Sequence, residues 1–284
     1  MKKFFIILWS VLTLSLIWND VSATPEKPYK DEFSGVVAIT GATKVLLESP
    51  DWYIRGAVGG VKGKDSDFSD NDCHSVSPPA LFGCGTGSDG KSLGAYGDFG
   101  KYLSMEIAGG KYVLPWLRTD MALTYRPNMK YSGSANFIGV SGPQPVSTTA
   151  RSLSLMGNVF FEPAPLLGLS QGHWHPYLGV GLGASYNRLK KVTYRFPEAS
   201  VHHISITPSG ERFDPAFMVS VGMGIVMSQK WMIDISLRYE DLGDVNTDQG
   251  GMYMNHVSEA LKIAKTEADV RGFGVFLSAR YFLF

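Results

Sequence analysis

The chain has 284 residues, of which 18% are charged and 12% are aromatic, and 32 of them are glycines. Lysine and arginine together number 26, as do aspartate and glutamate, so the formal net charge is zero and the electrostatic footprint of a nucleic-acid-binding protein is missing. The low charge and the high glycine and aromatic content also set the chain apart from an average soluble domain.

The N-terminus predicts export from the cytoplasm. Lys2 and Lys3 precede an apolar run over residues 4–17, and residues 21–23 (Val-Ser-Ala) place small side chains at the two positions that signal peptidase reads. A membrane-anchoring helix is the alternative, although an apolar run of about 14 residues is short for crossing a bilayer. No later run reaches about 18 apolar residues, so the mature chain is either soluble outside the cytosol or a membrane β-barrel.

Two cysteines lie in one polar segment rich in glycine and proline. Cys73 and Cys84 are expected to form a disulfide, because two nearby cysteines in an oxidising compartment usually pair. The alternative is a metal site with His74, which would need a further ligand such as Asp70 or Asp72.

From residue 51 onward, segments of about ten residues alternate apolar side chains with polar or small ones, as transmembrane β-strands do. The two faces are clearest in residues 231–240, where one carries Trp231, Ile233, Ile235, Leu237 and Tyr239 and the other carries Met232, Asp234, Ser236, Arg238 and Glu240. Eight strands are predicted, at 52–61, 102–110, 117–126, 152–161, 176–186, 217–227, 231–240 and 271–284.

The connections between these strands alternate in length. Short ones are expected near 111–116, 162–172 and 228–230, and long polar ones near 62–98, 127–148, 187–214 and 243–270. This alternation predicts an all-β, eight-stranded antiparallel transmembrane up-and-down barrel with short periplasmic turns and long extracellular loops. The expected organisation is a signal peptide (1–23), a periplasmic N-terminal segment (24–50) and an outer-membrane barrel domain (51–284). A soluble lipocalin-type barrel would not require this alternation.

Aromatic residues recur at the ends of the predicted strands. Four tryptophans fall at the periplasmic end, and three tyrosines close strands at the other end: Trp52, Trp116, Trp174, Trp231, Tyr125, Tyr186 and Tyr239. Amphipathic rings favour both membrane–water interfaces, so these positions predict two aromatic girdles. The chain also remains strand-like to its last residue, because a barrel in lipid must pair its last strand with its first.

The polar faces of these strands carry charges of both signs: Arg55, Glu106, Arg118, Asp120, Arg126, Asp234, Arg238, Glu240 and Arg280. An eight-stranded barrel is barely wide enough for its own side chains, so these charges are expected to pair and to plug the interior. Asp234 and Arg280 lie at similar depth on adjacent strands and are expected to interact, with Arg55 close by. A gated ion path through the same charges is the alternative.

Several stretches resemble the outer-membrane β-barrel family of opacity proteins and the OmpA-type membrane domain. They are "WYIRGAVGG" (52–60), "PYLGVGLGASY" (176–186), "WMIDISLRYEDLG" (231–243) and the closing "ARYFLF". The resemblance implies an eight-stranded barrel in the outer membrane of a Gram-negative bacterium, and roles in adhesion, envelope integrity or weak pore activity. It also implies that Phe282 and Phe284 form a C-terminal signal for the barrel-assembly machinery. Here, however, both lie on the parity opposite to the apolar face of the last strand, which predicts a twist, a bulge or a different register near Arg280.

The expected function is non-enzymatic: envelope integrity and surface contact through the loops, without a cofactor or metal and with an unidentified host or surface ligand. A narrow porin is the first alternative. A lipid-modifying enzyme is the second, using histidines and serines of the long loops: His202, His203, Ser205, His256 and Ser258. Residues 256–269 have the composition of a short surface helix. Arg271, with Lys262 and Lys265, is expected either to meet lipopolysaccharide phosphates or to form a solvated charged face.

Overall fold

The computed structural model describes residues 52–87, 89–140, 142–167, 174–198 and 203–283. The predicted signal peptide (1–23), the predicted periplasmic segment (24–50) and Phe284 lie outside the described residues. Within the ranges described, no helix is long and apolar enough to cross a membrane.

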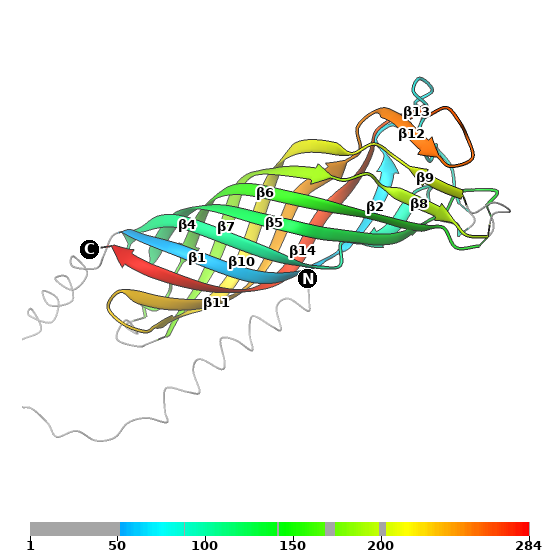
Figure 1. The fold of residues 1–284 in the computed structure, drawn as a ribbon. Coiled ribbons are helices and arrows are strands. Elements are labelled where there is room, and N and C mark those ends of the chain that lie inside the picture. Colours follow the sequence, from blue (N-terminus) through cyan, green and yellow to red (C-terminus); the bar gives the residue numbers. More distant parts are fainter. Residues whose placement is uncertain (1–51, 88, 141, 168–173, 199–202, 284) are drawn as a thin grey trace, which may run out of the picture. The chain divides into compact units, whose positions relative to one another are not determined.

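Eight long antiparallel strands form a closed ring, which confirms the predicted barrel (Figure 1). In ring order they are β1 (Trp52–Gly63), β4 (Lys101–Leu114), β5 (Leu117–Ala135), β6 (Pro145–Phe161), β7 (Trp174–Leu189), β10 (Gly210–Val226), β11 (Trp231–Asn246) and β14 (Thr266–Leu283). Each pairs with the next, and β14 pairs with β1 to close the ring. Closure leaves no strand edge facing lipid, where unpaired backbone groups would be costly.

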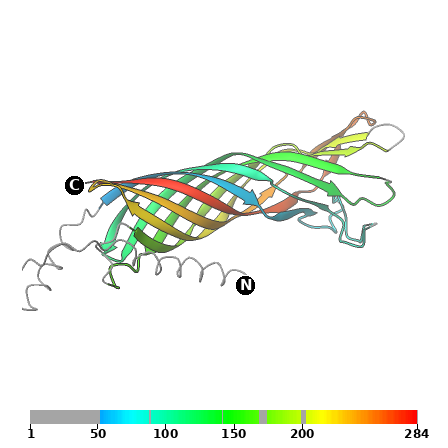
Figure 2. The same ribbon diagram turned by 90° about the horizontal axis from the view of Figure 1, so that it is seen from below.

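Six shorter strands extend the wall beyond the ring. They are β2 (Asp65–Asp70), β3 (Ala95–Asp98), β8 (Thr193–Phe196), β9 (His203–Ile206), β12 (Gly250–Met254) and β13 (Leu261–Ile263). They gather at the end of the barrel away from Leu283, where β2 pairs with β14, β3 with β5, and β8 with β6 (Figure 1). Figure 2 shows the same end from below, with the barrel strands running obliquely into it. We call this part the crown.

Residues 62–98, 187–214 and 243–270 were predicted to be long loops, but each of these segments contains strands of the crown. β5 continues to Ala135 and β11 to Asn246, so Tyr125 and Tyr239 lie within their strands and do not close them. The predicted surface helix over 256–269 is also wrong, since this segment contains β13 and the start of β14. Thr266 and Glu267 pair with β2, and that pairing favours strand over the local helical composition.

The wall separates an apolar outside from a polar inside, because successive side chains of a strand point to opposite faces. On β14, Phe273, Val275 and Leu277 are exposed, whereas Phe276, Ser278 and Arg280 are buried. The same alternation runs along β1 and β4. Single-residue alternation therefore assigns each side chain of the ring to one of two chemically different faces.

The last strand keeps a regular register to its end. β14 pairs with β1 without interruption from Gly272 to Leu283, so neither a bulge nor a shifted register exists near Arg280. Phe282 simply faces the interior, where its ring packs against Tyr53 and Tyr112. The expected bulge or different register is therefore wrong, and the parity of Phe282 reflects a residue that fills the interior near the chain end.

Close backbone approach explains one glycine in the wall. At Gly183 on β7, a Cβ atom would lie 2.0 Å from the carbonyl oxygen of Leu155 and 2.7 Å from the Cα of Met156. We expect Gly183→Ala to lower the free energy of unfolding by about 1–3 kcal/mol, the usual cost of overpacking. Gly56→Ala is the matched control, because nothing lies within 4 Å of a Cβ there. Urea unfolding in detergent micelles measures both, and equal losses would contradict this explanation.

Candidate functional site

The barrel interior holds a chain of buried ion pairs that crosses from strand to strand. Arg55 of β1 contacts Glu106 of β4 and, at 2.9 Å, Asp120 of β5. Glu106 also accepts a hydrogen bond from Arg238 of β11 at 2.7 Å. These links join opposite parts of the wall through the lumen, so the interior at this level is filled by side chains.

The series of buried ion pairs continues toward the Leu283 end of the barrel. Arg118 donates to Glu162 at 2.6 Å, and Arg280 lies 3.4 Å from the same carboxylate and 2.5 Å from Asp234. Arg280 is fully buried and also donates to the hydroxyl of Tyr112 at 2.6 Å. The structure thus brings Asp234 and Arg280 together, whereas Arg55 is bound to Glu106 and Asp120 instead.

A separate ion pair lies nearer the crown. Arg126 of β5 donates two hydrogen bonds to Glu240 of β11, at 2.8 and 2.6 Å. Both side chains are at most 3% exposed. The two parallel bonds make this a bidentate pair, the strongest geometry that arginine and a carboxylate form.

These interior ion pairs are balanced in charge. Five arginines face five carboxylates: Arg55, Arg118, Arg126, Arg238 and Arg280 against Glu106, Asp120, Glu162, Asp234 and Glu240. We call these ten residues the interior network. Burying an unpaired charge is costly, and the equal numbers allow every charge of the interior network to have a partner of opposite sign.

Glu162 is the member that sequence reasoning missed. It follows the last residue of β6, inside a predicted periplasmic turn, yet it is only 2% exposed and contacts two arginines. Its parity was the available signal, because exposed Phe161 requires an inward-facing neighbour. Tyr53, which donates to Asp120 and accepts from Arg118, was missed for another reason: an aromatic at an inward position suggested no polar role.

An apolar core fills the barrel interior between the interior network and the crown. Fully or almost fully buried side chains from the upper ring and the crown pack together there: Val61, Phe68, Phe99, Met129, Tyr131, Leu189, Val192, Tyr194, Leu242 and Val270. Phe68 and Tyr131 meet edge to face at 4.9 Å. Side chains therefore fill the interior at two levels: ion pairs lie toward the Leu283 end, and apolar packing lies toward the crown.

The outside of the ring has the pattern of a membrane-spanning barrel. Trp52, Trp174 and Trp231 open their strands and are 47–57% exposed, while Trp116 lies in the turn before β5. Tyr125, Tyr186 and Tyr239 lie further along β5, β7 and β11. From Trp231 to Tyr239 the strand rises about 26 Å, and a tilt of about 40° reduces this to about 20 Å, close to the apolar band of such barrels.

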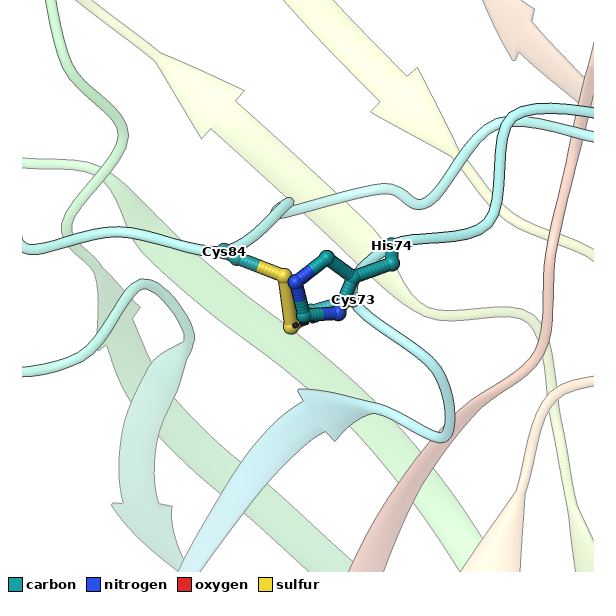
Figure 3. Close-up of side chains that lie close together, drawn as sticks. All are labelled: Cys73, His74 and Cys84. Carbon is teal, nitrogen blue, oxygen red and sulfur yellow. Dashed lines mark hydrogen bonds between the residues drawn. A yellow bond between two sulfur atoms is a disulfide. The ribbon is translucent and has the colours of Figure 1, made fainter.

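The crown carries the disulfide. Cys73 and Cys84 are bonded, and Nδ1 of His74 lies 3.6 Å from the sulfur of Cys73 (Figure 3). The ligand atoms of Cys73, His74 and Cys84 lie within 4.8 Å of one another, but the disulfide engages both sulfurs, so a metal site would require the reduced thiolates. Asp70 anchors the same loop by accepting backbone hydrogen bonds from Leu81, Phe82 and Gly83 at 2.8–2.9 Å. Burial raises the pKa of the Asp70 carboxyl, and these hydrogen bonds oppose the rise.

The histidines and serines of the enzyme alternative are partly brought together. The rings of His203 and His256 stack at 3.9 Å, and Ser205 is buried where β9 pairs with β12. His202 lies outside the described residues, and the structure records no hydrogen bond between Ser205 or Ser258 and a histidine that it describes. A serine nucleophile needs such a base within reach, and the described residues do not show one for Ser205 or Ser258.

No family model matches the chain, and no curated protein matches it. Three of the solved structures that are similar to it are the following. Neisserial surface protein A is 14% identical, with a TM-score of 0.39, over 82% of this chain and 97% of that one. OprG from Pseudomonas aeruginosa is 12% identical, with a TM-score of 0.44, over 82% and 95%. The outer-membrane protease OmpT from Escherichia coli is 8% identical, with a TM-score of 0.46, over 83% and 98%. At these values the function has to be argued from the residues of this chain.

Proposed function

We propose that this chain is a non-enzymatic outer-membrane β-barrel protein that contributes to envelope integrity and makes surface contacts through its crown. The observation that carries the proposal is the doubly closed interior beneath an ordered extension of the wall. Charge-balanced ion pairs and apolar packing support a closed, rigid barrel. The exposed tryptophans at the starts of β1, β7 and β11 support its placement across a membrane.

The crown is suited to contact because it is both exposed and braced. β2, β3 and β8 are hydrogen-bonded to long barrel strands, and the disulfide and Asp70 hold the connecting loop. Val76 and Ile138 are exposed apolar side chains in this part of the chain. Binding residues commonly lie on loops that a rigid scaffold positions, and the crown has this arrangement.

A narrow porin is the second candidate, and one observation favours it. Several buried polar atoms of the interior have no hydrogen-bond partner among the described residues: Ser104 Oγ, Ser152 Oγ, Asn158 Oδ1, Ser220 Oγ and Arg238 Nε. Water could hydrogen-bond to such atoms, and a continuous row of water molecules through the interior would allow ions or small solutes to pass.

Conductance separates these two candidates. We expect the wild-type protein to fractionate with the outer membrane, to change its gel mobility on boiling, and to pass no steady current in a planar lipid bilayer. A steady current that scales with voltage would favour the porin.

Acyl-chain analysis of lipids from cells carrying His203→Ala/His256→Ala tests the enzyme alternative, and we expect a lipid profile identical to that of the wild type.

A further inference from the structure

Two lysines face each other on the outside of the barrel. Lys62 of β1 and Lys101 of β4 are direct cross-strand partners, and both side chains are exposed. On its other side, Lys62 is paired with the exposed aromatic Phe273 of β14. Like charges placed directly opposite each other, with Cβ atoms about 5 Å apart, destabilise a sheet. The structure records no salt bridge between either lysine and an acidic group that it describes, so none of those acidic groups relieves the repulsion.

A hollow lies on the same strands, one step toward the membrane. It has a volume of about 370 Å³ and is lined by Val58, Gly59, Gly60, Leu103, Ile235, Val275, Phe276 and Leu277. Gly60 creates the depression, because it faces outward between Leu103 and Val275 and nothing lies within 4 Å of a Cβ placed there. Phe276, which packs inside the barrel under Gly59, forms part of its floor.

We propose that Lys62, Lys101 and this hollow form a binding site for a phosphate-bearing lipid of the outer leaflet. The two ammonium groups bind the phosphate of the headgroup, and one acyl chain lies in the hollow over Gly60. A phosphate between the lysines removes their mutual repulsion, and an acyl chain supplies the contacts that the missing side chain leaves open.

The position of the site identifies its occupant as a lipid. Lys62 is level with the aromatic Phe273, and the hollow opens onto the apolar band of the barrel. A free phosphate would make no contact with the apolar lining of the hollow. A soluble peptide would not reach it, because it opens onto the apolar band. The inference rests on the proposed placement of the chain in the outer membrane.

Other cations at the same rim are less suited to this role. Arg151 of β6 and Arg188 of β7 are also cross-strand partners, but Arg188 is bound to Glu211 at 3.0 Å. Lys130 of β5 is exposed and is paired with Thr149. No hollow among those recorded for the described residues lies beneath these cations. They provide matched controls for charge without an acyl-chain site.

Native mass spectrometry of the full chain in mild detergent tests the site with phosphorylated lipid A and with its dephosphorylated form. We expect the wild type to retain the phosphorylated form preferentially, and Lys62→Gln/Lys101→Gln to reduce that retention about thirtyfold, in line with the attraction of two lysines to an anionic lipid. Lys130→Gln/Arg151→Gln removes the same charge elsewhere on the rim and should change retention little. Gly60→Leu fills the hollow and should weaken retention, whereas Gly56→Leu, outward-facing on the same strand but outside the hollow, should not.

Three results would overturn the inference. One is equal retention of both lipid forms by the wild type, and another is an equal loss in both charge variants. The third is displacement of the lipid by millimolar inorganic phosphate, which would identify a free anion as the occupant. Heat-shift gels confirm that each variant is folded, and all six positions face away from the interior network. If the wild type neither shifts on boiling nor fractionates with the outer membrane, the proposed function itself fails, and lipid retention by micelle-bound protein then no longer supports a membrane site.

Discussion

Replacing Arg126 by methionine is expected to lower the free energy of unfolding by about 3–5 kcal/mol, the usual cost of leaving one charge of a buried pair uncompensated. Glu240 would keep only the hydroxyl of Tyr102 as a hydrogen-bond donor, at 3.3 Å. Methionine preserves most of the volume of arginine, so the loss reports on charge and not on a cavity. Urea unfolding in detergent micelles, followed by the gel shift on boiling, gives the measurement.

The control is the double variant Arg126→Met/Glu240→Leu. Because this pair is separate from the rest of the interior network, removing both charges leaves no uncompensated partner, and most of the lost stability should return. A double variant as unstable as the single one would show that the pair is needed for more than its own neutrality.

Arg280→Met is expected to have a still larger effect, above about 4 kcal/mol, because it deprives two carboxylates at once of a buried partner. Asp234 loses its recorded ion pair. Of the two arginines that contact Glu162, Arg118 remains, together with the hydroxyl of Tyr112, which donates to Glu162 at 3.1 Å. We expect little folded protein in the outer membrane, measured as the fraction that resists the detergent before boiling.

Arg280→Met/Asp234→Asn should rescue the folded fraction only in part. The substitution neutralises Asp234, but Glu162 and the hydroxyl of Tyr112 still lack the guanidinium that both contact in the wild type. Full rescue would mean that Arg280 and Asp234 act as an isolated pair, like Arg126 and Glu240, and would contradict the continuous network.

The two faces of the wall followed from residue order alone. All nine charges assigned to the interior are at most 7% exposed, and the alternating apolar residues of 231–240 lie outside. This was possible because a strand has a period of two, and one anchored residue therefore places every other residue of the strand. Hairpin connections then repeat the assignment on the neighbouring strand.

The partners within the buried ion pairs could not be predicted from the period-two alternation of the strands. Depth along adjacent strands suggested that Arg280 meets Asp234, but not that Arg55 bridges Glu106 and Asp120 or that Glu162 receives two arginines. Arg55–Glu106 and Arg118–Glu162 join neighbouring strands, whereas Arg55–Asp120 and Arg280–Glu162 join strands that are not paired with each other. Partner choice therefore depends on how the closed ring staggers its strands and not on sequence neighbours.

The number of ring strands, the closure of the ring, and the division of side chains between lipid and interior could all be predicted from residue order, because they depend on local periodicity and on the absence of edges in a membrane. The ends of the strands could not be predicted in this way. The crown exists because segments distant in the chain, such as β2 and the start of β14, find each other as backbone partners. Their hydrogen bonds are non-local and are possible only after the ring has brought the ends of its strands together.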